Sequence, residues 1–152
     1  MISNSPEETI AIGIKLARKL KKGSVVALIG DLGSGKTVFT KGIAEGLGVK
    51  NPRYVNSPTF VIIKEYKGKL PLYHFDIYRL DKSTILDAES YEEYFYGDGV
   101  SVIEWADKIR DLLPKKHIEV KLKIAGENKR KIEIKLSSLR GGAKRRRSNL
   151  SL

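Results

Sequence analysis

The sequence has no cysteine, and its only histidines are His74 and His117. The lack of cysteine excludes a disulfide framework and thiolate metal sites, and two scattered histidines are too few for a zinc site. No stretch reaches the roughly 18 apolar residues that a membrane span requires. The first residues, MISNSPEET, have neither the basic flank nor the apolar run of a signal peptide. We therefore expect a cytoplasmic protein with no membrane partner.

Acidic residues are also in the minority. The chain of 152 residues has 29 Lys and Arg against 18 Asp and Glu, which gives a formal net charge of +11. We expect one domain over residues 1–138 and a basic C-terminal tail over residues 139–152. The basic residues of that tail, which holds no acid, are Arg140, Lys144, Arg145, Arg146 and Arg147. Such a tail either contacts nucleic acid or an acidic protein surface, or is a solvated, mobile terminus; both alternatives stay open.

Helical and strand-like hydrophobic patterns alternate along the chain. Residues 5–23 predict an amphipathic helix, with Ser5 as the N-cap, Pro6 at the first position and Glu8 completing a capping box. The run SVVALI, residues 24–29, predicts a buried parallel strand. The same patterns predict helices over 36–48 and 83–99, strands over 59–68, 70–80 and 100–107, and a hairpin over 117–136. This order predicts an α/β domain with a mixed sheet flanked by helices and a C-terminal hairpin.

The stretch GDLGSGKT, residues 30–37, has the glycine spacing of a phosphate-binding loop. We expect Gly30 and Gly33 to adopt backbone angles closed to other residues, so that successive N–H groups form an anion nest. Lys36 is placed to reach the β- and γ-phosphates, and the Thr37 hydroxyl is placed to bind Mg²⁺. Because the loop follows a predicted strand and opens a predicted helix near Gly35, we expect a P-loop NTPase domain.

A P-loop site usually needs a second anchor for Mg²⁺, an acid at the end of a neighbouring strand. Glu104 in VSVIE fits that place, although a surface acid at a strand end is the alternative. Asp76 is suited to orienting an attacking water or to holding Mg²⁺ through water; alternatively it caps a helix or pairs with Arg79. The Asn-Lys-x-Asp signature of guanine binding is absent, which favours ATP, and Thr59 lies in a switch-like loop.

Together, GDLGSGKT, NSPTFVIIKEY, LYHFDIYRL and VIEWADKI resemble the TsaE (formerly YjeE) family of bacterial P-loop ATPases. The resemblance covers about residues 5–136 and leaves out the arginine-rich tail. It implies a role in making N6-threonylcarbamoyladenosine at position 37 of tRNAs. It also implies binding to the TsaD–TsaB heterodimer, which ATP hydrolysis resets between turnovers, with tRNA contacted only indirectly.

The resemblance also assigns roles to individual residues. The residues implied to wrap the phosphates are Asp31, Leu32, Gly33, Ser34, Gly35, Lys36 and Thr37. It gives Mg²⁺ to Thr37 and Glu104, catalysis to Lys36, Asp76 and Glu104, and a switch-like place to Thr59. Trp105, Arg130 and Thr9 are implied to lie beside the nucleotide, Thr9 by the adenine, while core packing is the alternative for Trp105.

Three other functions remain in competition. DIYR imitates the Asp-x-x-Arg with which some P-loop kinases grip an acceptor, although WADKIRDLL leaves little room for a lid. A nucleotide-gated binding module would hydrolyse slowly without a partner, since no arginine finger in cis is obvious. An RNA-binding protein would suit the positive charge but lacks interleaved surface aromatics. We expect weak ATPase activity that depends on the partner complex.

Overall fold

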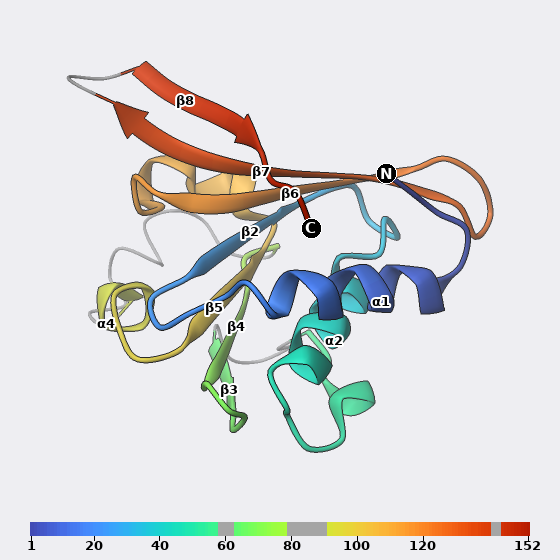
Figure 1. The fold of residues 1–152 in the computed structure, drawn as a ribbon, viewed down its shortest axis with the longest axis horizontal. Helices are drawn as coiled ribbons and strands as arrows, with labels where there is room; N and C mark the ends of the chain where they lie inside the picture. Colours follow the sequence, from blue (N-terminus) through green and yellow to red (C-terminus); the bar gives the residue numbers. More distant parts are fainter. Residues whose placement is uncertain (58–62, 79–90, 141–143) are drawn as a thin grey trace.

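The computed structural model describes residues 1–57, 63–78, 91–140 and 144–152. Its strands form one eight-stranded sheet in the order β1-β7-β6-β2-β5-β4-β3, and β8 also pairs with β7 (Figure 1). The strands are β1 (Ile2–Ser3), β2 (Val25–Ile29), β3 (Ile63–Tyr66), β4 (Leu72–Asp76), β5 (Val100–Glu104), β6 (His117–Ile124), β7 (Arg130–Arg140) and β8 (Lys144–Asn149). The α-helices are α1 (Pro6–Ala17), α2 (Lys36–Gly46) and α4 (Tyr91–Phe95), and the 3₁₀ helices are η1 (Pro52–Tyr54) and η2 (Ala106–Leu112). The predicted mixed α/β fold is confirmed.

Parallel strands make up the centre of the sheet. β2 pairs in parallel with β5 and β6, and β5 pairs in parallel with β4, while β3 and β7 add antiparallel strands on the two sides of this centre. The register places Leu28 of β2 and Asp76 of β4 on either side of Glu104 of β5. The carboxyl ends of these strands therefore meet at one edge of the sheet, where the glycine-rich loop leaves β2.

Two helices cover one face of the sheet. α1 and α2 lie against each other there (Figure 1), and their close approach depends on glycine. A Cβ added to Gly13 would lie 2.7 Å from the Phe39 carbonyl oxygen, and one added to Gly42 would collide with the carbonyl oxygen of Ile10. Beneath the helices, alternate residues of β2 such as Val26 and Leu28 join one buried cluster.

The start of α1 follows the predicted cap with one difference. The Ser5 hydroxyl accepts a hydrogen bond from the Glu8 N–H at 3.1 Å, and Pro6 opens the helix. The Glu8 carboxylate, however, accepts from the N–H of Asn4 at 2.7 Å. The reciprocal bond of the capping box therefore reaches one residue further back than Ser5.

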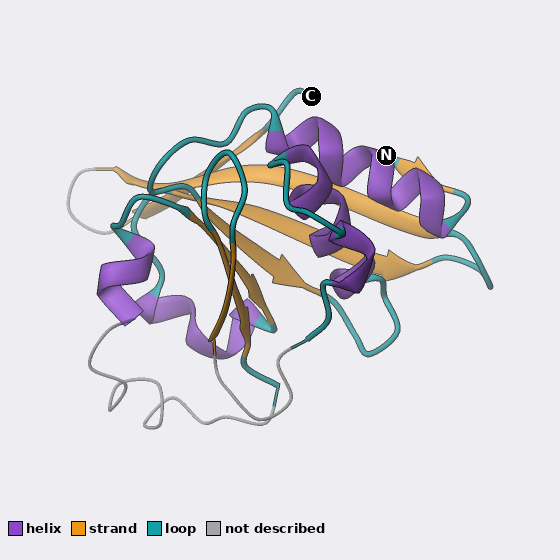
Figure 2. Cartoon of the chain, turned by 90° about the horizontal axis from the view of Figure 1, so that it is seen from below, coloured by secondary structure: helices purple, strands orange, loops and turns teal. Residues whose placement is uncertain are grey.

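The other face of the sheet has a second, aromatic core under α4 and η2. Phe75, Ile103 and Phe95 are buried together there, and Figure 2 shows the two groups of helices separated by strands. Of the helix predicted over residues 83–99, the structure describes α4, which is only five residues long. Residues 83–90 of that prediction lie outside the described residues.

The C-terminal hairpin is confirmed and is longer than predicted. β6 and β7 pair antiparallel from His117↔Ser137 to Ile124↔Arg130, and the Ala125 N–H donates to the Lys129 carbonyl at 2.9 Å across the turn. β7 runs on to Arg140, through the boundary expected after residue 138, and β8 pairs with it. Residues 144–149 therefore continue the sheet. In the described part of the chain, no helix has the length and apolar character to cross a bilayer.

Candidate functional site

The glycine-rich loop joins β2 to α2 at the carboxyl edge of the sheet. Gly33 and Gly35 have positive φ angles of 80° and 98°, and Gly35 is the N-cap of α2. Gly30 is not among the glycines with positive φ, so the reason predicted for it is wrong. A Cβ there would collide with the Ser34 hydroxyl and would lie 2.6 Å from the Leu122 carbonyl oxygen. Glycine is thus required at position 30 because Ser34 and Leu122 approach the backbone closely. The positive φ angles that favour glycine lie at Gly33 and Gly35.

Lys36 is folded back onto this loop. Its ammonium donates to the carbonyl oxygens of Gly30 at 2.6 Å and Asp31 at 2.9 Å, and lies 3.8 Å from the centre of the Trp105 ring. Burial lowers the pKa of Lys36, while the nearby carboxylates of Glu104 and Asp76 oppose that shift. The loop therefore holds a buried cation directly beside its backbone.

Trp105 joins the loop to the aromatic core. It has a positive φ of 62°, a costly conformation for a non-glycine residue, and its ring packs on Tyr78 with centroids 4.8 Å apart. The same ring makes a cation–π contact with the Lys36 ammonium. Trp105 is thus part of the core packing and also a neighbour of the loop lysine, and its place beside a nucleotide stays a prediction.

Glu104 lies at the end of β5 with only 2% of its surface exposed, which excludes the surface-acid alternative. Its Oε1 accepts hydrogen bonds from His74 Nε2 at 2.7 Å, Thr37 at 3.1 Å and Thr40 at 3.3 Å. Its Oε2 accepts from Thr37 at 3.0 Å and Ser57 at 3.3 Å. Burial alone would raise the pKa of Glu104, but the hydrogen bonds from His74, Thr37 and Thr40 outweigh it and hold the pKa below its usual value.

Three partners of Glu104 were missed by sequence reasoning: His74, Thr40 and Ser57. His74 is fully buried on β4, two residues before Asp76 and therefore on the same face of the sheet. Thr40 lies one helical turn after Thr37 on α2 and also bonds the Lys36 carbonyl at 2.9 Å. A polar residue at an inward position of a buried strand is the sequence signal that could have found His74.

Asp76 lies beside Glu104 in the parallel register of β4 and β5. Its Oδ1 accepts a hydrogen bond from the Tyr78 N–H at 3.0 Å, which fixes the carboxylate at the strand end. The alternative pairing with Arg79 and the switch-like place of Thr59 both concern residues outside the described part of the chain. Ser57, from the loop that leads to Thr59, does reach the site through its bond to Glu104.

Arg130 contacts the glycine-rich loop although it lies 97 residues from Gly33 in the sequence. Its Nη2 donates to the Gly33 carbonyl at 3.0 Å, although it comes from the start of β7. Leu32, at the tip of the loop, is 73% exposed, and the Ser34 hydroxyl is buried with no hydrogen-bond partner among the described residues. The Thr9 hydroxyl is hydrogen-bonded to Ser3 at 2.7 Å, and Ser3 is the register partner of Arg130; its place beside the adenine stays a prediction.

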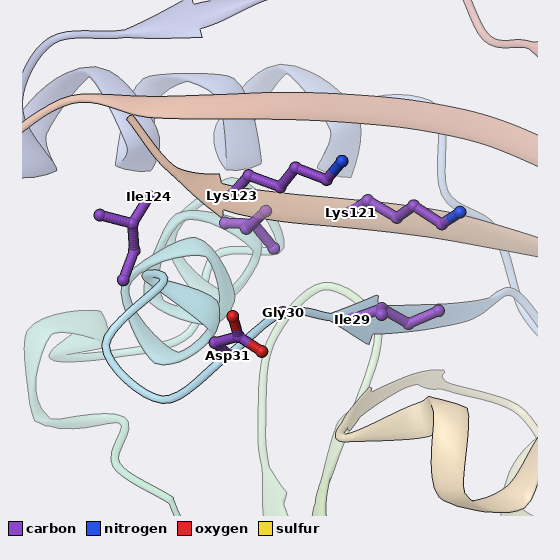
Figure 3. Close-up of a pocket in the computed structure, with 7 residues that line it drawn as sticks. Ile29, Gly30, Asp31, Lys121, Lys123 and Ile124 are labelled. Carbon is purple, nitrogen blue, oxygen red and sulfur yellow. The ribbon is translucent and has the colours of Figure 1, made fainter. Parts of the chain in front are cut away.

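A pocket of about 380 Å³ opens next to the loop, between the ends of β2 and β6. Figure 3 shows Asp31 and Ile124 on one side of it, with Lys121 and Lys123 on β6 above Ile29. Its volume lies in the range of small-molecule sites. The phosphate loop therefore has an adjoining cavity, and Lys121 and Lys123 are among the residues that line it.

The donor set around Glu104 fits Mg²⁺. The ion prefers hard oxygen ligands and is commonly held by one or two carboxylates together with phosphate oxygens. The Thr37 hydroxyl and the Glu104 carboxylate are already 3.0 Å apart, at the beginning of α2. The described residues hold no group of three or more His, Cys, Asp or Glu that could bind a metal by themselves. Mg²⁺ usually keeps several waters beside its carboxylate and phosphate ligands.

Parallel central strands, a glycine-rich loop between β2 and α2, and an acid at the end of the adjacent strand together define a P-loop protein. The family model "Threonylcarbamoyl adenosine biosynthesis protein TsaE" matches residues 3–132, and the chain belongs to this family. The resemblance found in the sequence motifs is thereby confirmed.

Curated relatives and a solved structure agree with this assignment. The "tRNA threonylcarbamoyladenosine biosynthesis protein TsaE" of Bacillus subtilis (strain 168) is 50% identical over 129 residues, which are 84% of this chain and 79% of the relative. The protein of the same name from Treponema pallidum (strain Nichols) is 38% identical over 133 residues, 88% of this chain and 97% of the relative. The crystal structure of Bacillus subtilis YdiB matches with a TM-score of 0.70 and 44% identity, over 87% of this chain and 80% of that one.

Proposed function

We propose that the protein binds ATP with Mg²⁺ at the glycine-rich loop and hydrolyses it to ADP and phosphate. The observation that carries this proposal is the contact between the loop residue Thr37 and Glu104, which lie 67 residues apart in sequence and 3.0 Å apart in space. A hydroxyl and a carboxylate at that place are the protein ligands that a nucleotide-bound Mg²⁺ uses in P-loop proteins.

Each residue then has a defined task in this proposal. The loop from Asp31 to Thr37 presents backbone N–H groups to the phosphates, and the dipole of α2 favours their negative charge. Lys36 exchanges its two carbonyl acceptors for phosphate oxygens, which bind an ammonium more strongly because they are charged. The Mg²⁺ held by Thr37 and Glu104 would neutralise charge on the phosphates.

Asp76 and Arg130 complete the proposed site. Asp76, whose carboxylate accepts from the Tyr78 N–H at the end of β4, would orient the attacking water. Arg130, which donates to the Gly33 carbonyl, would contact a phosphate with its guanidinium. Trp105 supports the site through its contact with Lys36.

The relatives' names point to the biological setting, tRNA threonylcarbamoyladenosine biosynthesis. We propose that the protein binds a TsaD–TsaB complex in the cytoplasm and that ATP hydrolysis resets this complex between rounds of tRNA modification. Turnover by the protein alone would be slow, because P-loop proteins commonly need a partner to complete the charge stabilisation. The basic C-terminal region, 139–152, is a proposed contact with tRNA or the partner complex.

The test is an ATPase assay with γ-labelled ATP, run on the protein alone and with TsaD–TsaB. Label released as free phosphate, faster with the partners and lost in Lys36→Ala, is the expected result. Label transferred to an added metabolite would instead identify a small-molecule kinase. Equal rates with and without TsaD–TsaB would contradict the partner-dependent role, and an unchanged rate in Lys36→Ala would contradict the assignment of the loop.

A further inference from the structure

His74 is an unexpected residue for its position. It is fully buried on β4, its neighbour two residues back on the same face is Leu72, and its register partner on β5 is Val102. Both of these neighbours belong to the apolar core cluster under α1 and α2. An apolar side chain would therefore suit the surroundings of position 74 better than an imidazole does.

The imidazole is only half satisfied by hydrogen bonds. Nε2 lies 2.7 Å from Glu104 Oε1, whereas Nδ1 is buried and has no hydrogen-bond partner among the described residues. A buried nitrogen without a partner costs stability. Stability therefore does not explain the choice of histidine, and the contact with Glu104 is the one feature that does.

The two oxygens of Glu104 face different surroundings. Oε1 accepts from His74 and Thr40, both of which have no exposed surface, and also from the Thr37 hydroxyl at 3.1 Å. Oε2 is bonded only to the partly buried hydroxyls of Thr37 and Ser57. Because an ionised carboxylate can only accept hydrogen bonds, the proton of the His74–Glu104 contact lies on Nε2. The short bond from this donor fixes the rotation of the carboxylate about its final torsion.

We propose that His74 is a positioning residue for divalent-cation binding: its Nε2–H holds Glu104 so that Oε2 stays directed at the loop hydroxyls, where the cation of the nucleotide is bound. This inference rests on the proposed function, since it concerns the same site. It assigns His74 no contact with nucleotide or cation. His74 acts in the way that outer-shell partners of ligating carboxylates do. Loss of such a partner typically weakens metal binding about 10- to 100-fold.

Because Nε2 is the His74 nitrogen that bonds Glu104, glutamine and asparagine at position 74 should differ in their effect on cation binding. The side-chain amide of glutamine can take the place of Nε2, whereas the shorter amide of asparagine reaches only the place of Nδ1. His74→Gln should therefore keep most of the cation affinity, and His74→Asn should lose about 10- to 100-fold. Phe75→Leu is the matched control, because Phe75 is buried on the same strand but faces the other core cluster.

The experiment measures Mn²⁺ binding to the full chain with saturating ADP, by the loss of the free Mn²⁺ electron paramagnetic resonance signal. ADP binding in excess chelator is measured in parallel and should be the same in all variants, because the phosphate loop is untouched. Wild-type Mn²⁺ affinity in His74→Asn would overturn the inference, and so would equal losses in His74→Asn, His74→Gln and Phe75→Leu. If His74→Asn does not fold, His74→Gln decides: near wild-type Mn²⁺ affinity supports the inference and a tenfold loss contradicts it. If the wild type itself binds no ADP, the proposed function fails first.

Discussion

Replacing Glu104 tests the site at the residue whose carboxylate accepts hydrogen bonds from His74, Thr37, Thr40 and Ser57. Glu104→Gln keeps the shape of the side chain and an oxygen that can accept from His74, but removes the charge and places an NH₂ group at one oxygen position. The Thr37 and Ser57 hydroxyls bonded to Oε2 can rotate and accept from that NH₂ group. Since hydrogen bonds to charged groups contribute about 1.5–3 kcal/mol and neutral ones about 1 kcal/mol, we expect a stability loss of about 1–2 kcal/mol.

Glu104→Ala should be far more damaging to the fold. It leaves the buried Nε2–H of His74 without its acceptor, at about 1–3 kcal/mol, and it opens a cavity. The Thr40 hydroxyl keeps its bond to the Lys36 carbonyl. For a chain of this length, each kcal/mol corresponds to about 2–4 °C in the melting temperature. The two variants should thus differ clearly in stability while both lose the carboxylate for Mg²⁺.

The assay is thermal unfolding with and without Mg-ATP. A ligand at 100 times its Kd stabilises the folded state by about 2.7 kcal/mol, which raises the melting temperature of the wild type by about 5–11 °C. Glu104→Gln should keep the fold and lose the part of this rise that depends on Mg²⁺. The same Mg²⁺-dependent rise in Glu104→Gln as in the wild type would refute the role of Glu104 in binding the cation.

Three further outcomes are expected. The pKa of Glu104 is lower in the folded state, so its stabilising contribution is present above its ordinary pKa and is lost as pH falls through the folded value. The free energy of unfolding should therefore fall less steeply with decreasing pH in Glu104→Gln than in the wild type. Equal slopes would contradict this. Gly42→Ala should lower the free energy of unfolding by about 1–3 kcal/mol because its Cβ meets the backbone of α1, whereas Gly126→Ala in the hairpin turn should change it little. A double-mutant cycle of Lys36→Met and Trp105→Leu should give a coupling of about 0.5–2 kcal/mol in the free energy of unfolding, and zero coupling would count against the cation–π contact.

The features that could be predicted from the sequence are those encoded by neighbouring residues. The loop from Gly30 to Thr37, the strand before it and the helix after it each depend on a short local pattern, and the structure has all three. Glu104 could be named because an acid that follows an apolar strand is visible within five residues. The hairpin of β6 and β7 was also visible, since both strands alternate around one turn.

The features that were missed depend on tertiary contacts. Nothing near His74 in the sequence indicates that its partner is Glu104, 30 residues away. The hydrogen bond from Arg130 to the Gly33 carbonyl joins residues 97 positions apart, and the family resemblance implied only that Arg130 lies beside the nucleotide. β8 was not predicted because its run of basic residues lacks an apolar alternation, so its strand depends on pairing with the edge of β7.

The central claim is that the loop and Glu104 together bind Mg-ATP, and isothermal titration calorimetry tests it most directly. We predict a single-site binding signal for ATP in the wild type that becomes tighter when Mg²⁺ is added, and a weak or absent signal in Lys36→Ala. A folded wild-type protein that gives no binding signal with Mg-ATP would contradict the claim.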